Sequence, residues 1–482
     1  MSVISPAALE NLYNLLGSKG FTADRQAIEP WLTDWRGRFH GDSVALLSPS
    51  SAEEVAAVMR LAGEFRIPIV PQGGNTSMVG GATPPADGSA LILSLRRMNR
   101  IRSLSHEDGV AVAEAGVILA HLHDAAAEIG MRFPLTLGGK GSATVGGLVS
   151  TNAGGTQVLR FGTMRALTLG IEAVLPDGSI FNGLDPLKKD NRGYDLRHLL
   201  IGAEGTLGVV TAASLHLVPA ILDRAVGWVG LESPHKALEL LRLIEKRAGT
   251  AIEGFEVVPA DSLGRVLRHI PGTRAPLSGT HRWHALVELD RSDPQAADPV
   301  TLLEALLADG IAQGLVADAI VARSEAQADS FWKLRDSISE AERASGPALQ
   351  HDISVPVARM PDFMISAAAD VERAFPGVQA SAFGHLGDGN VHFHVRAPEG
   401  AGGDWPMACG GPISAHVHDL VVATGGSISA EHGIGQMKRA ENARLADPAR
   451  LLALRAIKAA LDPAGLLNPG KLVPLAMDEA AP

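Results

Sequence analysis

Apolar positions recur along the chain at spacings that alternate between helical and extended. Helical spacing predicts helices at 6–17, 234–247, 300–316, 325–345, 361–374, 412–423 and 448–461, and a capping box, Ser51 with Glu54, begins another helix. Short apolar runs predict strands at 67–70, 167–175, 213–218, 225–231, 284–289 and 351–357. After Pro219, strands and helices alternate without long parallel runs. This pattern favours an antiparallel sheet with helices on one face.

Residues 380–395 predict a β-hairpin rich in histidine. Its centre, 387–390, has the composition of a turn (Gly-Asp-Gly-Asn), and apolar residues alternate with histidines after it. If those four residues form the turn, His385 faces His392, with Cβ atoms about 4.5–5.5 Å apart. Two imidazoles at that separation suit a divalent metal, with Glu431 as a third ligand. The alternatives are that His394 replaces His392, or that the histidines are ordinary residues.

Three glycine-rich stretches in the first half of the chain indicate close approach of the backbone to a ligand. Residues 72–81 follow a strand and can direct successive N–H groups at a phosphate, although a plain turn would look similar. Residues 134–155 are dense in glycine, and 201–211 lead into another strand. Neither a Walker A loop nor a G-x-G-x-x-G motif after the first strand is present, so a Rossmann site is not supported.

Composition narrows the possible partners. At 482 residues the chain predicts two or more domains. Its formal net charge of −11 argues against nucleic acid and anionic membranes as partners. The one cysteine, Cys409, excludes an internal disulfide and a cysteine-based metal site. Neither a signal-peptide pattern nor a long apolar run is present, so we expect a cytoplasmic protein that is not integral to the membrane.

Six motifs then occur in an order that is characteristic of one family. They are the segments 71–77 (PQGGNTS), 150–155 (STNAGG), 202–208 (GAEGTLG), 384–392 (GHLGDGNVH), 430–435 (AEHGIG) and 468–471 (NPGK). Together they resemble the FAD-dependent D-2-hydroxyacid dehydrogenases of the vanillyl-alcohol-oxidase (PCMH-type FAD) superfamily. That group includes D-2-hydroxyglutarate dehydrogenase, D-lactate dehydrogenases and the glycolate oxidase FAD subunit. The resemblance covers nearly the whole chain, from Leu47 to Leu472.

The resemblance implies an α+β protein in three parts. Residues 1–219 would form a two-subdomain PCMH-type FAD-binding domain with its core at 40–219. Residues 220–435 would form a substrate (cap) domain with an antiparallel ferredoxin-like sheet and the metal site, and 436–482 would return to the FAD domain. Covalent members commonly carry a histidine in the first loop, but 73–81 contain none and Asn75 lies near that place. We therefore predict noncovalent FAD.

The resemblance also assigns the cofactor-binding residues. Those expected to hold or line FAD are Pro71, Gly73, Gly74, Asn75, Thr76, Ser77, Thr136, Gly138, Gly139, Ser142, Thr144, Gly147, Asn152, Ala153, Gly154, Glu204, Gly205, Gly208, Val210 and Asn468. Of these, 73–77 would wrap the pyrophosphate, and Asn468 would reach the flavin from the C-terminal end.

For the reaction, the resemblance implies a metal on His385, His392 and Glu431, with zinc as the preferred ion, and His432 as the base. A D-2-hydroxy acid would chelate the ion, and hydride would pass from C2 to flavin N5 while His432 takes the hydroxyl proton. Arg335 and Ser339, four apart on the 325–345 helix, match positions that bind the substrate carboxylate. The remaining predicted substrate-binding residues are Gln350, Asn390 and His394.

D-2-hydroxyglutarate is the leading substrate, oxidised to 2-oxoglutarate. Related members often carry a lysine where Gln350 stands, and asparagine where His394 stands, so D-lactate, glycolate or D-malate stays open. A transferase similar to alkyl-dihydroxyacetonephosphate synthase is the alternative from another enzyme class. An electron-transfer flavoprotein or a quinone is the expected electron acceptor, and a homodimer is the expected assembly.

Overall fold

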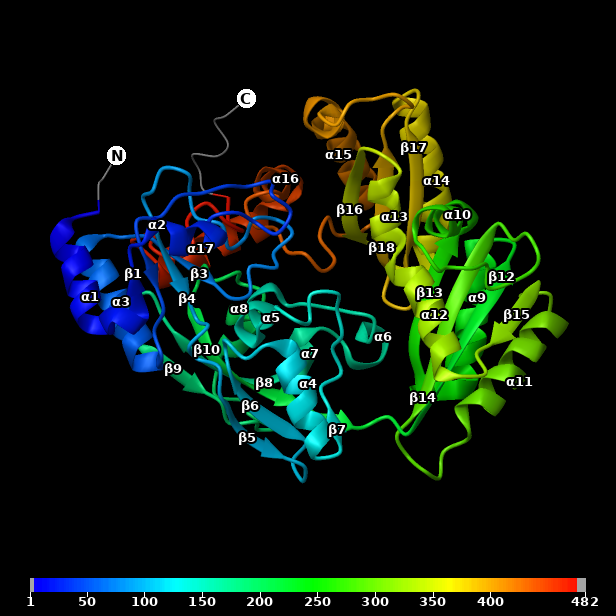
Figure 1. Ribbon diagram of the computed structural model, residues 1–482, viewed down its shortest axis with the longest axis horizontal. Helices are drawn as coiled ribbons and strands as arrows, with labels where there is room; N and C mark the ends of the chain where they lie inside the picture. The colour runs from blue at the N-terminus through cyan, green and yellow to red at the C-terminus, as the bar shows by residue number, and fades with distance from the viewer. Residues whose placement is uncertain (1–3, 475–482) are drawn as a thin grey trace. The chain divides into compact units, whose positions relative to one another are not determined.

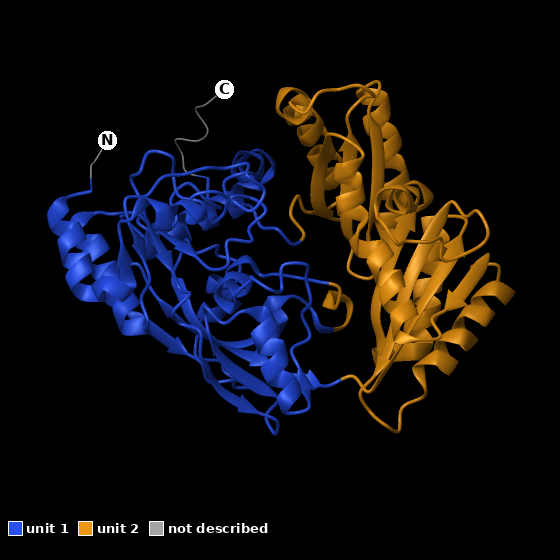
Figure 2. Cartoon of the chain, in the orientation of Figure 1, with its two compact units in different colours: residues 1–155, 161–220, 431–482 blue, residues 156–160, 221–430 orange. Residues whose placement is uncertain are grey.

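The computed structural model describes residues 4–474, which divide into two compact units. Unit 1 comprises the chain up to residue 155, residues 161–220 and the chain from 431 onward; unit 2 comprises 156–160 and 221–430 (Figure 2). The expected domain boundary after 219 lies one residue before the observed division at 220, and the one expected after 435 lies five residues beyond the division at 430. The membership of 156–160 in unit 2 was not foreseen. Within the described range, no helix is both long and apolar enough to cross a bilayer.

Unit 1 holds two main sheets, each with its own hydrophobic core (Figure 1). The first has the order β1-β2-β4-β3, with β4 parallel to both neighbours, and the second has the antiparallel order β5-β6-β10-β8-β9. A pair, β11-β7, stands apart. The strands are β1 Phe21–Thr22, β2 Leu46–Leu47, β3 Ile69–Gln72, β4 Leu91–Ser94, β5 Ile101–Ser105, β6 Val110–Glu114, β7 Met131–Arg132, β8 Thr168–Val174, β9 Ile180–Gly183, β10 Val209–His216 and β11 Val218–Pro219.

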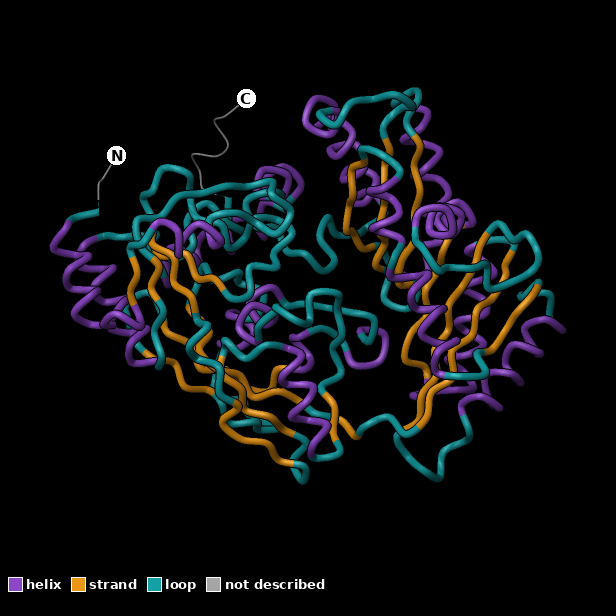
Figure 3. The backbone as a smooth tube through the Cα atoms, viewed as in Figure 1, coloured by secondary structure: helices purple, strands orange, loops and turns teal. Residues whose placement is uncertain are grey.

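The helices of unit 1 are short, apart from α1, α3, α4 and α17. In α3 the expected capping box is present in part: Ser51 Oγ accepts from the Glu54 N–H, and Glu54 reaches back to the Ser50 N–H. The helices are α1 Pro6–Gly20, α2 Arg25–Ile28, η1 Glu29–Trp31, α3 Ala52–Phe65, α4 Leu119–Glu128, α5 Val145–Thr151, α7 Met164–Leu167, α8 Leu196–Leu200, α16 Arg439–Leu445 and α17 Pro448–Leu461, with α6 Val158–Phe161 at the boundary. Long loops join many of these elements (Figure 3).

Unit 2 is built on one seven-stranded sheet of order β15-β12-β14-β13-β17-β18-β16, antiparallel throughout as expected. Its strands are β12 Asp223–Leu231, β13 Ile252–Pro259, β14 Trp283–Arg291, β15 Asp318–Val321, β16 Ala348–Ser354, β17 Gln379–His385 and β18 Asn390–Arg396. Its helices are α9 Pro234–Ala248, η2 Gly249–Ala251, α10 Ala260–His269, α11 Pro299–Ala312, α12 Glu325–Asp336, α13 Ile338–Ala344, η3 Val357–Arg359, α14 Met360–Ala374 and α15 Trp405–Ala423.

Helices cover both faces of this sheet, so the prediction of helices on one face is wrong. One core packs Val229 and Val287 against α9, α11, α14 and α15. A second core packs Trp228 and Leu286 against α10, α12 and α13. Neighbouring positions of the central strands are therefore both buried, which is why these strands read as continuous apolar runs and not as alternating ones.

The histidine hairpin forms, with a register two residues away from the expected one. His385 pairs with Asn390, and Phe383 pairs with His392, so the turn is 386–389 and not 387–390. Gly389 has φ of +83° and donates its N–H to the His385 carbonyl at 3.1 Å, which places the positive-φ residue at the end of the turn. A shift by two preserves the face on which each side chain lies, because side chains alternate along a strand.

The predicted helix at 325–345 is two helices. Alpha-helix α12 ends at Asp336 and α13 begins at Ile338, with Ser337 between them at φ −79° and ψ −3°. The Ser337 N–H bonds to the carbonyls of Lys333 and Arg335, which tightens the last turn and ends α12. Arg335 and Ser339 therefore do not share one face of one helix. Other boundaries moved less: β16 begins at 348 and not 351, and α15 begins at 405 and not 412.

The segment 156–160 is anchored in unit 2 by charge and by packing. The Arg160 guanidinium pairs with Glu253 at 3.2 Å and with Asp290. Leu159 lies so near the hairpin turn that a Cβ at Gly387 would be 2.5 Å from its Cδ1. The turn that carries the candidate metal histidines is thus packed against a segment that precedes it by more than 200 residues.

Candidate active site

A buried ionic cluster occupies one face of the unit 2 sheet at the histidine hairpin. The Glu256 carboxylate, on β13, accepts from Arg335 Nε at 2.8 Å and from His385 Nδ1 at 2.6 Å. Arg335 Nη2 lies 3.2 Å from His385 Nε2. Because Nδ1 donates its proton to Glu256, Nε2 is the ring nitrogen that presents a lone pair.

The cluster fixes the charge of Glu256. Burial, the largest influence, would raise the pKa of this carboxyl, but the charge of Arg335 and the hydrogen bonds from Arg335 and His385 outweigh it and hold the pKa well below its usual range. Glu256 is therefore a carboxylate at any physiological pH. It neutralises Arg335, whose side chain is also almost fully buried.

Aromatic rings extend the same face along β17 and β18. The rings of His385 and His392 have centroids 5.4 Å apart, and Phe383 lies between His392 at 5.1 Å and His394 at 5.0 Å. Burial and the nearby positive charge of Arg335 lower the pKa of His392 well below its usual value, so this imidazole is neutral. A neutral imidazole is the form that binds metals.

The neighbouring strand β16 closes this face with polar side chains. Asp352 pairs with His392 and Gln350 pairs with His394 across the β16–β18 ladder. Asn390 Nδ2 donates to Asp352 Oδ1 at 2.8 Å and to the Ile353 carbonyl at 3.0 Å. Of the predicted substrate-binding residues, Arg335, Gln350, Asn390 and His394 thus belong to one sheet face or its covering helix.

Three predicted residues lie outside that face. Ser339 is on α13, beyond the break at Ser337, and is half-buried. Glu431 and His432 lie in a loop at the start of the last segment of unit 1, directly after Ala430, the last residue of unit 2. The His432 side chain is thus carried by the chain that returns to the cofactor-binding unit.

In unit 1 the predicted cofactor loops meet one another closely. Gly73 and Gly74, which follow β3, pack on 142–147: a Cβ at Gly73 would lie 2.3 Å from Thr144 Oγ1, and one at Gly74 would lie 1.8 Å from the Ser142 carbonyl. A Cβ at Gly205 would lie 3.2 Å from Pro71. These glycines are needed because their neighbours leave no room for a side chain.

Several buried polar atoms in these loops have no hydrogen-bond partner among the residues described. They include Asn75 Oδ1, Thr144 Oγ1 and Asn468 Oδ1. Asn75 and Asn468 also adopt positive φ, +52° and +43°, while their Nδ2 atoms bind backbone carbonyls. Buried polar atoms normally have partners, and an FAD molecule would supply them. The residues present therefore fit FAD.

The other predicted cofactor residues lie along the same three stretches of unit 1. Thr76, Ser77, Thr136, Gly138, Gly139 and Ser142 are in loops, Gly147 is in α5, Asn152, Ala153 and Gly154 follow it, and Gly208 and Val210 are at β10. Two of them have packing roles: Val210 belongs to the hydrophobic core, and a Cβ at Gly208 would meet Leu200 at 2.9 Å. The Asn152 side chain accepts from the Arg165 N–H and stabilises its own loop.

Sequence reasoning missed Glu256, Asp352 and Phe383. Glu256 stands in the run Ile252–Pro259, which is otherwise mostly apolar, and a carboxylate inside a buried strand is a signal that could have been used. Its partner could not have been identified, because the contact joins residues 79 and 129 positions apart.

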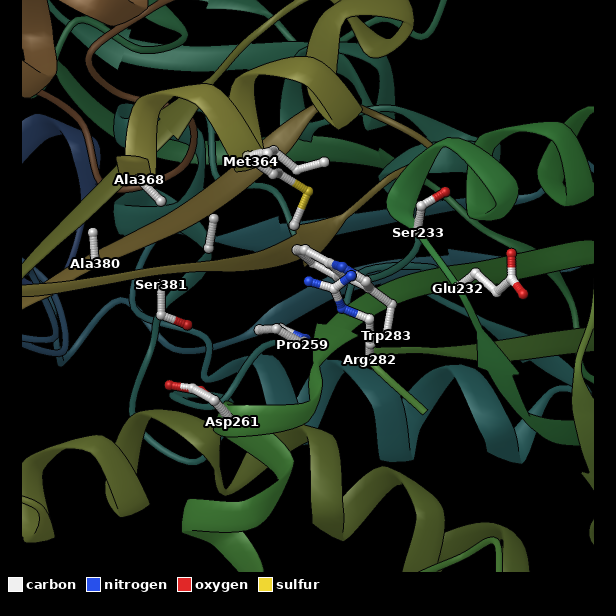
Figure 4. Close-up of a pocket in the computed structure, with 12 residues that line it drawn as sticks. Glu232, Ser233, Pro259, Asp261, Arg282, Trp283, Met364, Ala368, Ala380 and Ser381 are labelled. Carbon is white, nitrogen blue, oxygen red and sulfur yellow. The ribbon is translucent and has the colours of Figure 1, made fainter. Parts of the chain in front are cut away.

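Unit 2 also has a cavity at the other end of β17 (Figure 4). Its volume is about 480 Å³, and Asp261, Arg282, Met364 and Ser381 are among its lining residues. Asp261 is already paired with Arg265 and Arg396 at 3.0 and 2.9 Å. None of the predicted site residues lines this cavity.

Two family models match the chain over most of its length. Residues 223–472 match the C-terminal domain of FAD linked oxidases, and residues 44–183 match an FAD binding domain.

Curated relatives are similar over nearly the whole chain. D-2-hydroxyglutarate dehydrogenase of Arabidopsis thaliana mitochondria is 36% identical over 95% of this chain and 80% of its own length. The mitochondrial enzyme of Bos taurus is 36% identical over 98% and 84%, and the Xanthomonas citri pv. viticola enzyme is 35% identical over 92% of each.

Solved structures share the fold at low identity. They include p-cresol methylhydroxylase (TM-score 0.74, 16% identity, 96% of each chain) and alkyldihydroxyacetonephosphate synthase (TM-score 0.73, 15% identity, 97% of this chain and 85% of that one). They confirm the expected PCMH-type FAD-binding fold. The likeness to the synthase shows the fold alone, while the sequence relatives are dehydrogenases. The chain is therefore an FAD-dependent oxidoreductase that belongs to the family of FAD-linked oxidases, together with the D-2-hydroxyglutarate dehydrogenases.

Proposed function

We propose that this protein oxidises D-2-hydroxyglutarate to 2-oxoglutarate, with a divalent metal on His385, His392 and Glu431 and with His432 as the base. The observation that carries the proposal is the buried cluster of Arg335, Glu256 and His385 beside His392. It places a cation, an imidazole oriented by Glu256 and a second, neutral imidazole on one face, and these groups can hold the carboxylate and hydroxyl of a hydroxy acid. The named activity of the similar dehydrogenases supports the choice of substrate.

The donor set in unit 2 fits a divalent ion. His385 is oriented by a carboxylate, the arrangement that commonly orients metal-binding histidines, and His392 is uncharged. An ion at His385 Nε2 would replace the contact from Arg335 Nη2, which is 3.2 Å away. The Arg335 Nη2 donor would then be available to the substrate carboxylate, while Nε stays bound to Glu256. Nitrogen and oxygen donors suit zinc, and they also accept manganese, cobalt or iron.

Each residue then has a defined task. Arg335 binds the C1 carboxylate through its planar fork of donors. Glu256 keeps Arg335 and His385 in place. His432 accepts the proton of the 2-hydroxyl group, for which imidazole has a suitable pKa. Bound FAD supplies the two-electron acceptor, and a bound metal would lower the pKa of the hydroxyl group.

Gln350 and His394 favour a second candidate, a shorter acid such as D-lactate or glycolate. They are opposite each other on β16 and β18, and neither carries a fixed positive charge for a second carboxylate. The mechanism would be the same. An electron-transfer flavoprotein or a quinone is the proposed acceptor, a homodimer the proposed assembly, and the cytoplasm the proposed location.

Anaerobic reduction of the bound flavin tests the proposal. We expect D-2-hydroxyglutarate, and not its L enantiomer, to bleach the flavin absorbance, with loss on chelation and recovery with zinc. Bleaching by D-lactate alone would select the shorter substrate. Bleaching that survives complete removal of metal would contradict the metal's role.

A further inference from the structure

Glu204 has a buried carboxylate that binds the loop following His432. One carboxylate oxygen accepts the Ile434 N–H at 2.7 Å, and the other accepts the Gly435 N–H at 2.7 Å. The two partners are 230 and 231 residues away, yet all of these residues belong to unit 1. Glu204 itself adopts φ of +50°, so its backbone is held in an uncommon conformation.

The loop is shaped to receive this carboxylate. Gly433 and Gly435 both have positive φ, +80° and +53°, and the successive N–H groups of Ile434 and Gly435 converge on one anion. A Cβ at Gly433 would lie 2.8 Å from Glu204 Oε1, and one at Gly435 would lie 2.3 Å from the Val79 carbonyl. Conformation and space both require glycine at the two positions.

Further contacts tie the same loop to the cofactor-binding segments. The N–H groups of Gln436 and Met437 donate to the Val79 carbonyl, each at 3.2 Å. Asn468 Nδ2 donates to the carbonyls of Gly81 and Glu204 at 2.9 and 2.7 Å. The anchor is therefore part of the scaffold that carries the predicted FAD loops.

Positive charges accompany the buried acid. Burial raises the pKa of Glu204, while the two backbone N–H groups and the charges of Lys438 and Lys471 act in the opposite direction. Lys438 and Lys471 are themselves buried. A carboxylate with this surrounding makes strong charge-assisted hydrogen bonds.

We propose that Glu204 is a positioning residue for proton transfer: it fixes the loop so that His432, one residue before Gly433, is held in register with the cofactor-binding loops. Glu204 acts through the backbone and does not touch the substrate. The inference rests on the proposed role of His432 as the base. It gives the Glu204 side chain a task distinct from lining the flavin.

The test substitutes Glu204→Gln. The amide keeps the size of the side chain but turns one acceptor into a donor that faces an N–H group. We expect kcat to fall by about 100-fold, since small misplacements of catalytic groups have effects of that size. Rates are expressed per bound FAD, so that a loss of cofactor does not count as a loss of kcat. KM should change little, and the limb of the kcat pH profile that reports the base should shift.

Glu114→Gln is the matched control. Glu114 is a buried, ion-paired carboxylate of the same unit, bound to Arg100 at 2.9 Å and Arg102 at 3.3 Å. Its substitution removes a similar charge at a position remote in sequence from the 433–435 loop. It should therefore lower the stability of the protein without shifting the pH profile of kcat. If Glu204→Gln folds poorly, Gly433→Ala replaces it in the test. This substitution perturbs the same hydrogen bonds from the loop side and should cause the same fall in kcat.

Hydrogen exchange supplies a readout that is independent of turnover. The amides of Ile434 and Gly435 should exchange at least about 10-fold faster in Glu204→Gln than in the wild type or Glu114→Gln, because the hydrogen bonds that protect them are lost or weakened. Unchanged exchange would refute the anchor. Faster exchange with unchanged kcat and pH profile would refute the positioning role. Inactivity of the wild type toward hydroxy acids, with exchange still accelerated, would instead refute the proposed function and leave the anchor established.

Discussion

The two units build their candidate sites from different parts of the chain. In unit 1 the site depends largely on the backbone: Gly74 lies against the Ser142 carbonyl, and the N–H groups of Ile434 and Gly435 converge on one carboxylate. In unit 2 the site is mostly side chains: Arg335, Glu256 and the hairpin histidines project from strands and a helix that are otherwise apolar. Substitutions that add atoms should therefore impair the unit 1 site most, and substitutions that remove functional groups should impair the unit 2 site most.

The difference follows from what each site has to recognise. Backbone N–H groups of glycine-rich loops suit a large cofactor with an anionic linker, since they bring many weak donors near at once. Side chains suit chemistry, since only they offer ionisable groups. Glu204 is the exception in unit 1, because its side chain accepts hydrogen bonds from the backbone of another loop.

Removing His392 should have the largest effect. His392→Ala would take away one proposed metal ligand, and we expect metal content to fall to near zero and turnover to fall by about 1,000-fold or more, since a metal's Lewis acidity is worth several kcal/mol. Metal analysis of the purified variant and anaerobic flavin reduction measure the two quantities. His416→Ala is the control, because His416 is a histidine of the same unit that pairs with Asp370 at 2.7 Å. Equal metal content in His392→Ala and wild type would remove His392 from the ligand set.

The second largest effect is expected when one methyl group is added to a glycine of the first cofactor loop in unit 1. In Gly74→Ala the new Cβ would lie 1.8 Å from the Ser142 carbonyl, so the loops must separate. Overpacking costs about 1–3 kcal/mol, which corresponds to about a 10- to 100-fold loss of FAD affinity. Fluorescence titration of the apoprotein with FAD measures it. Gly63→Ala, in α3, has its closest neighbour at 4.0 Å and should bind FAD normally. Normal affinity in Gly74→Ala would mean that this loop does not form the cofactor site.

Removing the charge of Glu256 tests whether this carboxylate supports the proposed metal site. Gln in its place can accept from Arg335 or from the His385 Nδ1–H with one oxygen only. We expect metal affinity to fall by about 10- to 100-fold, the usual effect of losing an outer partner of a metal-binding histidine. Competition with a chromogenic chelator measures it. Glu342→Gln is the matched control: Glu342 is also buried and paired with an arginine, Arg396. A loss of the same size in both variants would point to general destabilisation.

Local patterns predicted many elements of the fold, although the strand β13 and the helix α10 were not among them. The antiparallel sheet of unit 2, the α3 cap and the closing helix α17 all come from short-range spacing. The prediction of the hairpin register was wrong because Gly387 and Gly389 both fit a turn. Only the three-dimensional structure shows that Gly389 has the positive φ. The prediction of one helix at 325–345 was wrong because nothing in the sequence near Ser337 interrupts the helical pattern.

The sequence predicted the kinds of residue in the candidate site but not all of the contacts between them. The histidine pair follows from hairpin spacing and from a short motif of the family, and Arg335 follows from the family resemblance alone. Glu256 and the contact of Glu204 with the 433–435 loop could not be derived from spacing. Both depend on contacts between residues far apart in sequence, which the chain's local pattern does not encode.

Two carboxylates of unit 2 show that burial alone does not mark a functional group. Glu256 and Glu288 lie on neighbouring strands and on the same sheet face, where α12 covers them with Arg335 and Trp332 respectively. The pKa of Glu256 is lowered, because a cation faces it. The pKa of Glu288 is raised to about 7, chiefly by burial and also by Glu253 and Asp290, although Trp332 and Arg224 oppose the shift.

The smallest effect on activity is expected for Glu288→Gln, which should instead alter the pH dependence of stability. A carboxyl whose pKa is higher in the folded state than in the unfolded state contributes stability below the unfolded pKa, and this contribution disappears as pH rises to about 7. The wild type should therefore lose up to about 3 kcal/mol from this group between pH 4.5 and 7, and the variant should not. Thermal unfolding at pH 5 and pH 8 measures it: the variant should gain relative to the wild type at pH 8, with flavin reduction unchanged. A variant that loses activity would place Glu288 with Glu256 in the chemistry, and the distinction between functional and structural carboxylates on this face would fall.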